Sequence, residues 1–154
     1  MKITYKGDYA LKAILQLALR YDGEEGDVVS INEIAKDGDM PTKFLEQILL
    51  VLRKGGFVKA KRGVNGGFYL AKRPAEITIG DIVRFIEGPI EPISCAEEGC
   101  YKGCKDIASC IFRDIWKEVG TAISLVVDTI TFGDLVMKHR EKTLKLGPVF
   151  DYSI

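Results

Sequence analysis

The sequence has no hydrophobic run of about 18 residues, the length needed to cross a membrane. Its opening segment, Met1–Asp8, lacks the apolar core of a secretory signal peptide. It has a single histidine and contains no His-Glu protease helix, nucleophile elbow or Walker loop. These absences argue against a membrane protein, a secreted protein and an enzyme. We therefore expect a cytoplasmic protein with a binding role.

A net charge is also lacking, because 22 basic residues balance 22 acidic ones. The charges are nevertheless unevenly distributed, and residues 41–73 carry eight basic residues against Glu46 alone. A concentrated basic surface of this kind is typical of proteins that contact phosphate. The sequence therefore allows a nucleic-acid partner despite its overall neutrality.

Cysteine is absent from most of the chain. The four cysteines, Cys95, Cys100, Cys104 and Cys110, lie within 16 residues of one another. Structural disulfides are disfavoured in a chain without a secretion signal, so the cluster indicates metal binding or redox chemistry. With 154 residues, 47% of them hydrophobic, the chain is long enough for one domain with a core of its own, or one small domain with an appended arm.

Hydrophobic periodicity predicts three helices in the first third of the chain. Apolar residues recur at helical spacing from residue 8 to about residue 21. Ser30, followed three residues later by Glu33, is a capping-box pattern that opens a short helix, and Gly38 closes it. A longer helix is expected over residues 41–54, with proline in its first turn and Gly-Gly after its end.

The third of these helices has two different faces. Its predicted buried face consists of Phe44, Leu45, Ile48, Leu49 and Leu52. Its opposite, polar face consists of Lys43, Glu46, Gln47 and Lys54, with Leu50 as an apolar exception. Two helices joined by a tight glycine-containing turn, the second with a polar outer face, match a helix-turn-helix.

A basic β-hairpin is expected directly after these helices. Residues 57–61 and 68–70 have strand composition, and Asn65-Gly66 between them favours a tight turn in which both residues have positive φ. The glycines here are flanked by strands on both sides, so they do not form a phosphate-binding loop. A helix-turn-helix followed by such a hairpin is a winged helix.

The second half of the chain is expected to form a short helix, an irregular cysteine-rich segment and a long helix. The short helix covers residues 78–87, and the long one runs from about Asp106 to Thr131. The broad apolar face of the long helix needs a partner, and we expect a second copy of the chain to cover it. The residues expected at this dimer contact are Ile115, Trp116, Val119, Ile123, Val126 and Ile130.

The predicted fold is mainly α with a small β-hairpin wing. It comprises a winged helix-turn-helix domain over residues 1–88, a cysteine-rich cluster-binding loop over 89–110, a dimerisation helix over 106–131, and a C-terminal arm and loose tail over 132–154.

Several segments resemble the Rrf-type (BadM-like) family of bacterial winged-helix regulators, in particular its iron–sulfur branch with IscR-, NsrR- and RirA-like members. The segments are Met1–Leu11, Phe44–Leu49 leading to Leu52–Val58, the hairpin Arg62–Leu70, Cys110 followed at a spacing of five residues by Trp116, and Thr129–Leu135. The resemblance implies a homodimeric transcription regulator that binds a pseudo-palindromic site in double-stranded DNA.

The resemblance also implies which residues read the DNA. The positions that match the family's base-reading residues are Lys43, Glu46 and Gln47 in the major groove and Arg62 in the minor groove. Their chemistry is suitable, because Glu accepts from cytosine, Gln pairs with adenine and Arg favours a narrow minor groove. The residues expected to contact phosphate are Thr42, Lys54, Lys59, Lys61 and Asn65. Lys43 departs from the small polar residue of IscR-like members, so the operator sequence stays open.

Cluster-binding members of the family have five residues between their last two cysteines, as Cys104 and Cys110 do here. Either all four cysteines hold a [2Fe–2S] or [4Fe–4S] cluster, or three do and an oxygen ligand completes the set. Asp8 occupies the position at which NsrR-like proteins supply an aspartate, here from the same or the other subunit; the alternative is that Asp8 is the N-cap of the first helix. IscR-like members instead use a histidine shortly after the last cysteine, where this chain has Arg113.

Other roles for the cysteines remain open. A structural zinc site usually has paired Cys-x2–4-Cys knuckles, whereas the spacings here are four, three and five residues. A thiol or disulfide switch is a further alternative, and an iron–sulfur electron carrier is another, although it would leave the winged helix without a role.

Overall fold

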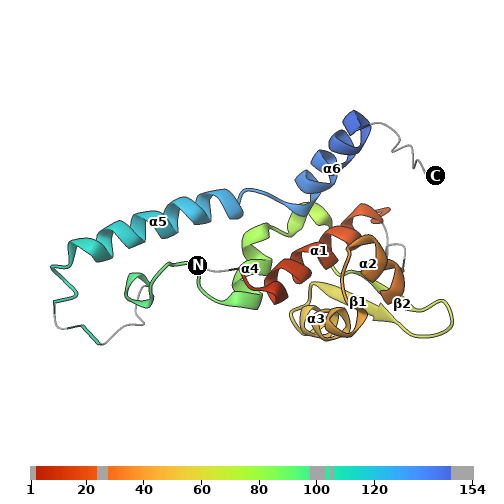
Figure 1. Ribbon diagram of the computed structural model, residues 1–154, viewed down its shortest axis with the longest axis horizontal. Helices are drawn as coiled ribbons and strands as arrows, with labels where there is room; N and C mark the ends of the chain where they lie inside the picture. The colour runs from red at the N-terminus through yellow and green to blue at the C-terminus, as the bar shows by residue number, and fades with distance from the viewer. Residues whose placement is uncertain (1–2, 24–27, 98–102, 105, 147–154) are drawn as a thin grey trace, which may run out of the picture.

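The computed structural model describes residues 3–23, 28–97, 103–104 and 106–146 (Figure 1). In this part of the chain the fold is mainly helical with one small hairpin, as the sequence predicts. The elements in chain order are α1 (Tyr5–Leu19), α2 (Ile31–Asp37), α3 (Thr42–Lys54), β1 (Val58–Lys61), β2 (Gly67–Leu70), the 3-10 turn η1 (Pro74–Glu76), α4 (Ile79–Glu87), the 3-10 turn η2 (Ser94–Ala96), α5 (Ile111–Val127) and α6 (Phe132–Leu146).

Side-chain caps set where the first helices begin. The predicted capping box at Ser30 is confirmed, since its hydroxyl accepts from the Glu33 backbone N–H while the Glu33 carboxylate accepts from the Ser30 backbone N–H. Helix α1 begins three residues earlier than the periodicity suggested, because Thr4 is its N-cap and accepts from the backbone N–H of Gly7. The alternative of Asp8 as this cap is therefore wrong. Asp8 lies in the first turn, with its carboxylate 3.0 Å from the Lys12 ammonium.

The two strands pair antiparallel, with Val58 opposite Leu70 and Lys61 opposite Gly67. The turn between them lies one residue earlier than the Asn65-Gly66 pattern predicts. The backbone N–H of Gly66 donates to the carbonyl of Gly63 at 2.9 Å, and Gly63, not Asn65, has the positive φ, of 116°. A glycine is required at position 63 because a side chain there would be strained.

Helix α1 lies at the centre of the N-terminal domain and packs against α2, α3, α4, α6 and β2. Its buried face includes Ala10, Ala13 and Ile14, and the two alanines allow the neighbouring helices to approach closely. The fully or nearly fully buried side chains of α3 are Leu45, Ile48, Leu49 and Leu52, which confirms most of the predicted face. Phe44 is an exception, because 60% of it is exposed.

Helix α5 projects away from the N-terminal domain as a single long rod (Figure 1). It is shorter at both ends than the predicted span of residues 106–131. At its start, residues 106–109 form a separate turn closed by a hydrogen bond from the Ser109 N–H to the Asp106 carbonyl. At its end, Ile130 and Thr131 form backbone contacts with the segment before α4 instead, with the Ile79 N–H donating to the Ile130 carbonyl at 3.0 Å.

The residues after Phe132, expected to form a short arm and loose tail, form helix α6 as far as residue 146. Thr131 caps this helix, since its hydroxyl accepts from the Asp134 N–H and the Asp134 carboxylate accepts from the Thr131 N–H. Phe132 is fully buried, and α6 packs against α1 and η1. The prediction of a loose tail was wrong because α6 carries many charged residues and contacts the domain mainly through its first turns, so its sequence lacks a long apolar face. Residues 147–154 of the predicted tail lie outside the described residues.

Within the described ranges, no helix is both long and apolar enough to span a membrane.

Candidate nucleic-acid interface and cysteine segment

The turn between α2 and α3 places α3 at the surface of the domain. Asp39 has a positive φ of 50°, and the Met40 N–H donates to the Ala35 carbonyl at 2.9 Å, so the chain reverses within a few residues. Met40 is buried under this turn and fixes the second helix against the first. This is the helix-turn-helix arrangement that the sequence predicts.

All nine residues predicted to contact DNA are exposed. They are Thr42, Lys43, Glu46, Gln47, Lys54, Lys59, Lys61, Arg62 and Asn65. The first five lie on α3, whose other side is held in the core, so their side chains are presented on a rigid element. Helix α3 begins at Pro41 without a side-chain cap and without an acidic residue in its first turn. Its N-terminal N–H groups and positive dipole end are therefore available to a phosphate.

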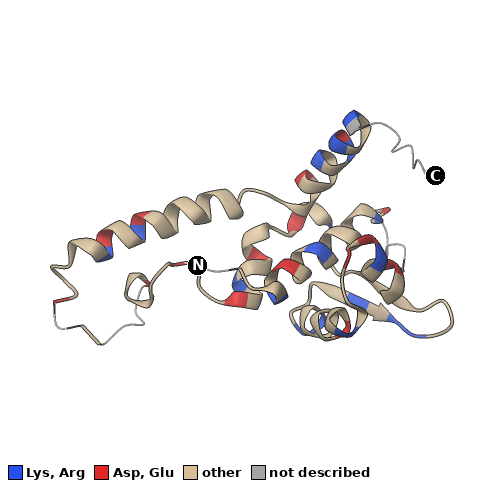
Figure 2. Ribbon diagram, viewed as in Figure 1, with Lys and Arg blue, Asp and Glu red and all other residues tan. Residues whose placement is uncertain are grey.

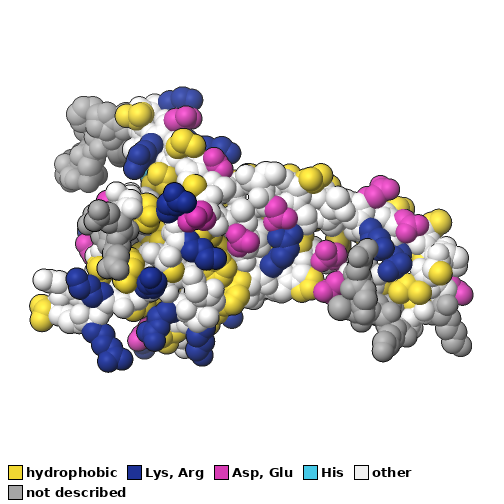
Figure 3. All heavy atoms as spheres, turned by 180° about the vertical axis from the view of Figure 1, so that it is seen from behind, with side chains coloured by type: hydrophobic (Ala, Val, Ile, Leu, Met, Phe, Trp, Pro, Cys, Tyr) yellow, Lys and Arg dark blue, Asp and Glu magenta, His cyan; other side chains and the backbone are white. Residues whose placement is uncertain are grey.

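The hairpin extends this surface with positive charge. Val58 is buried, whereas Lys59 and Lys61 both point to the opposite face because side chains alternate along a strand. Arg62 follows directly at the hairpin turn. Lysine and arginine positions lie on α3 and along the hairpin (Figure 2), and from behind their side chains gather at the lower edge of the domain (Figure 3).

Two further basic residues join this surface. Arg53, at the end of α3, and Lys72, after β2, line a groove of about 510 Å³ together with Lys59 and Tyr69. Both residues belong to the basic stretch of residues 41–73 but are not among the nine residues predicted to contact DNA. Arg73 contributes less, because its guanidinium lies 3.1 Å from the Glu76 carboxylate and this hydrogen bond lowers the pKa of Glu76. The pair is locally neutral.

The cysteine segment lies at the start of α5. Cys95 is part of η2, Cys110 is the residue before the first turn of α5, and both are half-buried, whereas Cys104 is exposed. Cys100 lies outside the described residues. The three described cysteines are free thiols. In the described ranges, no three metal-ligating side chains lie close enough to hold an ion, so Asp8 and these cysteines are not brought together within this one chain.

A hydrogen bond of Arg113 links the segment that contains Cys95 to the start of α5, next to Cys110. The Arg113 Nε donates this hydrogen bond of 2.7 Å to the Cys95 carbonyl, across 18 residues of sequence. Because Arg113 lies three residues after Cys110, this bond holds the η2 turn against the first turn of α5. Gly120, the one buried residue of α5, lies opposite Glu91, and its lack of a side chain gives the segment before η2 room to approach.

The apolar side chains of α5 are largely uncovered. Ile111, Phe112, Ile115, Trp116, Leu125 and Val126 are all exposed. Val119, Ile123 and Ile130, which belong to the same predicted contact, are half-buried. A 17-residue helix whose one buried residue is a glycine gains little stability from packing against the described part of this chain.

A clamp joins the other end of α5 to the winged-helix domain. Arg84 of α4 makes two hydrogen bonds to the carboxylate of Asp128, of 2.5 and 2.9 Å, and a third of 3.0 Å to the Ser124 hydroxyl. The Arg84 hydrogen bonds lower the pKa of Asp128. The direction of α5 relative to α4 is thus set by the bidentate ion pair between Arg84 and Asp128 and by the β-bridge between Thr78 and Thr131.

Comparison with known proteins decides the family. The sequence model of the Rrf2 family, described as an iron-dependent transcriptional regulator, matches residues 3–138. The chain belongs to the Rrf2 family. It is 39% identical over 137 residues to an rrf2-like HTH-type transcriptional regulator of Rhodobacter capsulatus, covering 87% of this chain and 91% of that protein.

Solved Rrf2-family structures agree with this assignment. The structure of CymR, the global cysteine regulator of B. subtilis, is 33% identical with a TM-score of 0.72, and the match covers 90% of this chain and 98% of CymR. The structure of T. potens IscR is 31% identical with the same TM-score of 0.72, covering 93% and 91% of the two chains. The predicted resemblance is confirmed, and this Rrf2-family chain is a transcriptional regulator rather than an enzyme.

Proposed function

We propose that this Rrf2-family regulator binds a pseudo-palindromic site in duplex DNA as a homodimer. The observation that carries this proposal is the exposed polar face of α3 next to a basic hairpin, both held on a rigid core. In the proposed complex, Lys43, Glu46 and Gln47 contact base edges in the major groove, and Arg62 enters the minor groove. Lysines and Asn65 on the hairpin, with Thr42 and Lys54 on α3, contact phosphates and fix the register.

The exposed apolar face of α5 supports the dimer. Two copies of α5 packed side by side would cover Ile115, Trp116 and Val126, which are uncovered in the single chain. An isologous contact of this kind would also place two winged-helix domains at the two ends of the assembly. That arrangement suits two half-sites related by two-fold symmetry.

We further propose that the cysteine segment holds an iron–sulfur cluster. The donor set fits the group, because Cys95, Cys104 and Cys110 are free and Cys100 completes four thiols, the usual ligation of [2Fe–2S] and [4Fe–4S] clusters. The fourth ligand is either the remaining cysteine or Asp8 of the partner subunit. Bound there, the cluster would supply a chemistry that responds to redox state, iron supply or nitric oxide.

The residues of this chain provide a mechanical route from the cysteine segment to the DNA-reading surface. Arg113 ties the Cys95 turn to the start of α5, and the rigid rod of α5 leads to the clamp between Asp128 and Arg84. Helix α4, which carries Arg84, packs against α1, and α1 packs against α3. A change in the order of the cysteine segment would therefore alter the relative placement of the two α3 helices, which is the type of coupling worth about 1–3 kcal/mol in allosteric proteins.

The cysteine proposal is tested by anaerobic purification, followed by visible absorption and iron, sulfide and zinc analysis of the wild type and of Cys104→Ala and Cys110→Ala. We expect a coloured wild type and loss of colour in both variants. Asp8→Ala, with Asp22→Ala as a carboxylate control, reports on the oxygen ligand. A colourless, zinc-loaded protein would contradict the cluster, and so would a colourless protein with free thiols.

The DNA proposal is tested separately with the same preparations. Fluorescence anisotropy with duplex DNA at a series of salt concentrations should give a log-linear loss of affinity, because phosphate contacts release counterions. Equal affinity of cluster-loaded and cluster-free protein for the same operator would refute the proposed coupling. Absence of any duplex binding would refute the regulator's proposed mode of action.

A further inference from the structure

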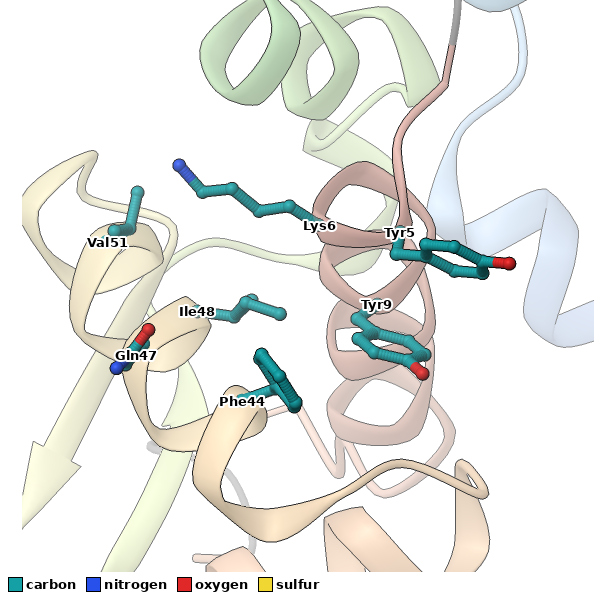
Figure 4. A pocket seen from close by; sticks show the side chains of 7 residues that line it. All are labelled: Tyr5, Lys6, Tyr9, Phe44, Gln47, Ile48 and Val51. Atoms are coloured by element: carbon teal, nitrogen blue, oxygen red, sulfur yellow. The ribbon is translucent and has the colours of Figure 1, made fainter.

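A cavity of about 480 Å³ opens between α1 and α3 (Figure 4). Tyr5, Lys6 and Tyr9 of α1 form one side of it, and Phe44, Ile48 and Val51 of α3 form the other, with Gln47 at its edge. Its volume lies within the range of about 300–1,000 Å³ that is usual for small-molecule sites. Its walls are mainly hydrophobic and aromatic, which is also usual for such sites.

Two of the rings at this cavity are more exposed than their type predicts. Phe44 is 60% exposed and Tyr5 is 84% exposed, although the helical pattern assigned Phe44 to the buried face of α3. Phe44 instead points into the gap between the two helices, below Ile48 (Figure 4). Covering such an exposed ring with another apolar group is favourable, because it removes apolar surface from water.

The charge at the cavity indicates the kind of group that would enter it. Lys6 extends from α1 across the mouth toward Val51, and among the described residues it is the single charged side chain that lines the cavity (Figure 4). The ion pairs found among the described residues involve Lys12, Arg20, Arg73 and Arg84, and none of them engages Lys6. One ammonium beside an apolar cavity is complementary to one anionic group on an apolar body.

We propose that this cavity binds a small carboxylic acid with an apolar body. The carboxylate pairs with the Lys6 ammonium, and the body lies against Tyr9, Phe44 and Ile48. A cavity of about 480 Å³ suits an occupant of about the size of a small aromatic acid or a medium-chain fatty acid. The Gln47 amide at the edge provides a hydrogen bond to a polar substituent.

The site has a regulatory consequence that rests on the proposed DNA binding. Gln47 lines the cavity and also belongs to the surface proposed to contact bases. An acid bound against Phe44 and Ile48 would constrain α3 and the Gln47 side chain, so it would change operator affinity directly, independently of the cysteine segment.

The binding itself is measured without DNA, by isothermal titration of the full-length dimer with phenylacetate, cinnamate and octanoate, each paired with its neutral amide. We expect at least one acid to bind about tenfold more tightly than its amide, because a charge-assisted hydrogen bond is stronger than a neutral one. Lys6→Met should abolish that preference, whereas Lys12→Met, six residues further along α1, should retain it. Val51→Trp fills the cavity and should abolish binding of both members of each pair.

Equal affinity for acid and amide, an unchanged preference in Lys6→Met, or no binding by any probe would overturn the proposal. If no acid binds and Val51→Trp converts the dimer into a monomer in sedimentation, the occupant is a second copy of the chain and the proposal is wrong. A wild type that binds an acid with the expected preference but binds no duplex DNA would refute the proposed function while leaving the cavity assignment standing. Lys6 is exposed, so the Lys6→Met variant should fold normally even if Val51→Trp does not.

Discussion

The clamp between Arg84 and Asp128 makes a prediction about how α5 is held to the DNA-reading domain. The two side chains are 40% and 42% exposed, so solvent screens their attraction. Exposed ion pairs contribute up to about 1 kcal/mol to the free energy of unfolding, and the bidentate geometry places this pair near the upper end of that range. We expect Arg84→Met and Asp128→Asn each to lower the free energy of unfolding by about 1 kcal/mol, with a coupling of about 0.5–1 kcal/mol between them.

Gly80 offers an independent way to break the clamp without removing a charge. A Cβ at this position would collide with the carboxylate of Asp128 and crowd the Arg84 guanidinium. In a Gly80→Ala background, Asp128→Asn should therefore cost much less than it does in the wild type. Comparing the two costs removes the effect of alanine's higher helix propensity, which alone is worth up to about 1 kcal/mol.

The clamp should also depend on pH in a definite direction. The Arg84 hydrogen bonds lower the pKa of Asp128 in the folded protein, so its contribution is present above the unfolded pKa of about 3.9 and is lost as pH falls through the folded value. Asp128→Asn should remove this part of the acid sensitivity. At neutral pH the contribution of the clamp is fully present.

Urea unfolding of the single and double variants, at neutral pH and near pH 3, measures all of these quantities. Glu76→Gln is the control, because its ion pair with Arg73 is more exposed, at 71% and 48%, and lies within a single short turn, so its loss should cost less. A coupling of zero between Arg84 and Asp128, or an unchanged cost of Asp128→Asn in the Gly80→Ala background, would refute the reasoning.

Three further predictions concern DNA reading, the dimer and the last helix. Glu46→Ala should change base preference in a binding selection, whereas Lys59→Ala should weaken all duplexes alike and reduce the salt slope by about one. Trp116→Glu should shift sedimentation from dimer to monomer, because it places a charge in the proposed α5 contact. Phe132→Ala should lower the free energy of unfolding by about 3–5 kcal/mol in a thermal or urea melt, since it empties a fully buried site.

The dimer prediction and the last-helix prediction each have a control on the same element. Glu118→Gln lies on a different face of α5 from Trp116 and should leave the dimer intact. Met137→Ala lies on the exposed side of α6 and should change stability by no more than about 0.5 kcal/mol. Uniform weakening by Glu46→Ala combined with altered base preference in Lys59→Ala would reverse the assigned roles.

Features that depend on neighbouring residues were predictable from the sequence. The capping boxes at Ser30 and Thr78, the buried side of α3 and the pairing of the two hairpin strands all depend on contacts within a few residues or on a simple periodicity. The family was also predictable from the sequence, because the resemblance depends on short contiguous segments of the chain. The capping pattern at Thr131 and Asp134 was also visible in the sequence and would have indicated α6.

The tertiary structure alone decided what depends on distant segments. Its spacing places Phe44 on the buried side of α3. It is nevertheless exposed, because the side chains of α1 do not fill the space next to it and a cavity remains between the two helices. Residues 130 and 131 have helical spacing with α5, yet they leave that helix because the segment before α4 pairs with their backbone groups. Local propensities within α5 and α3 cannot specify such contacts, since the free energy that decides them comes from packing and hydrogen bonds between segments far apart in the sequence.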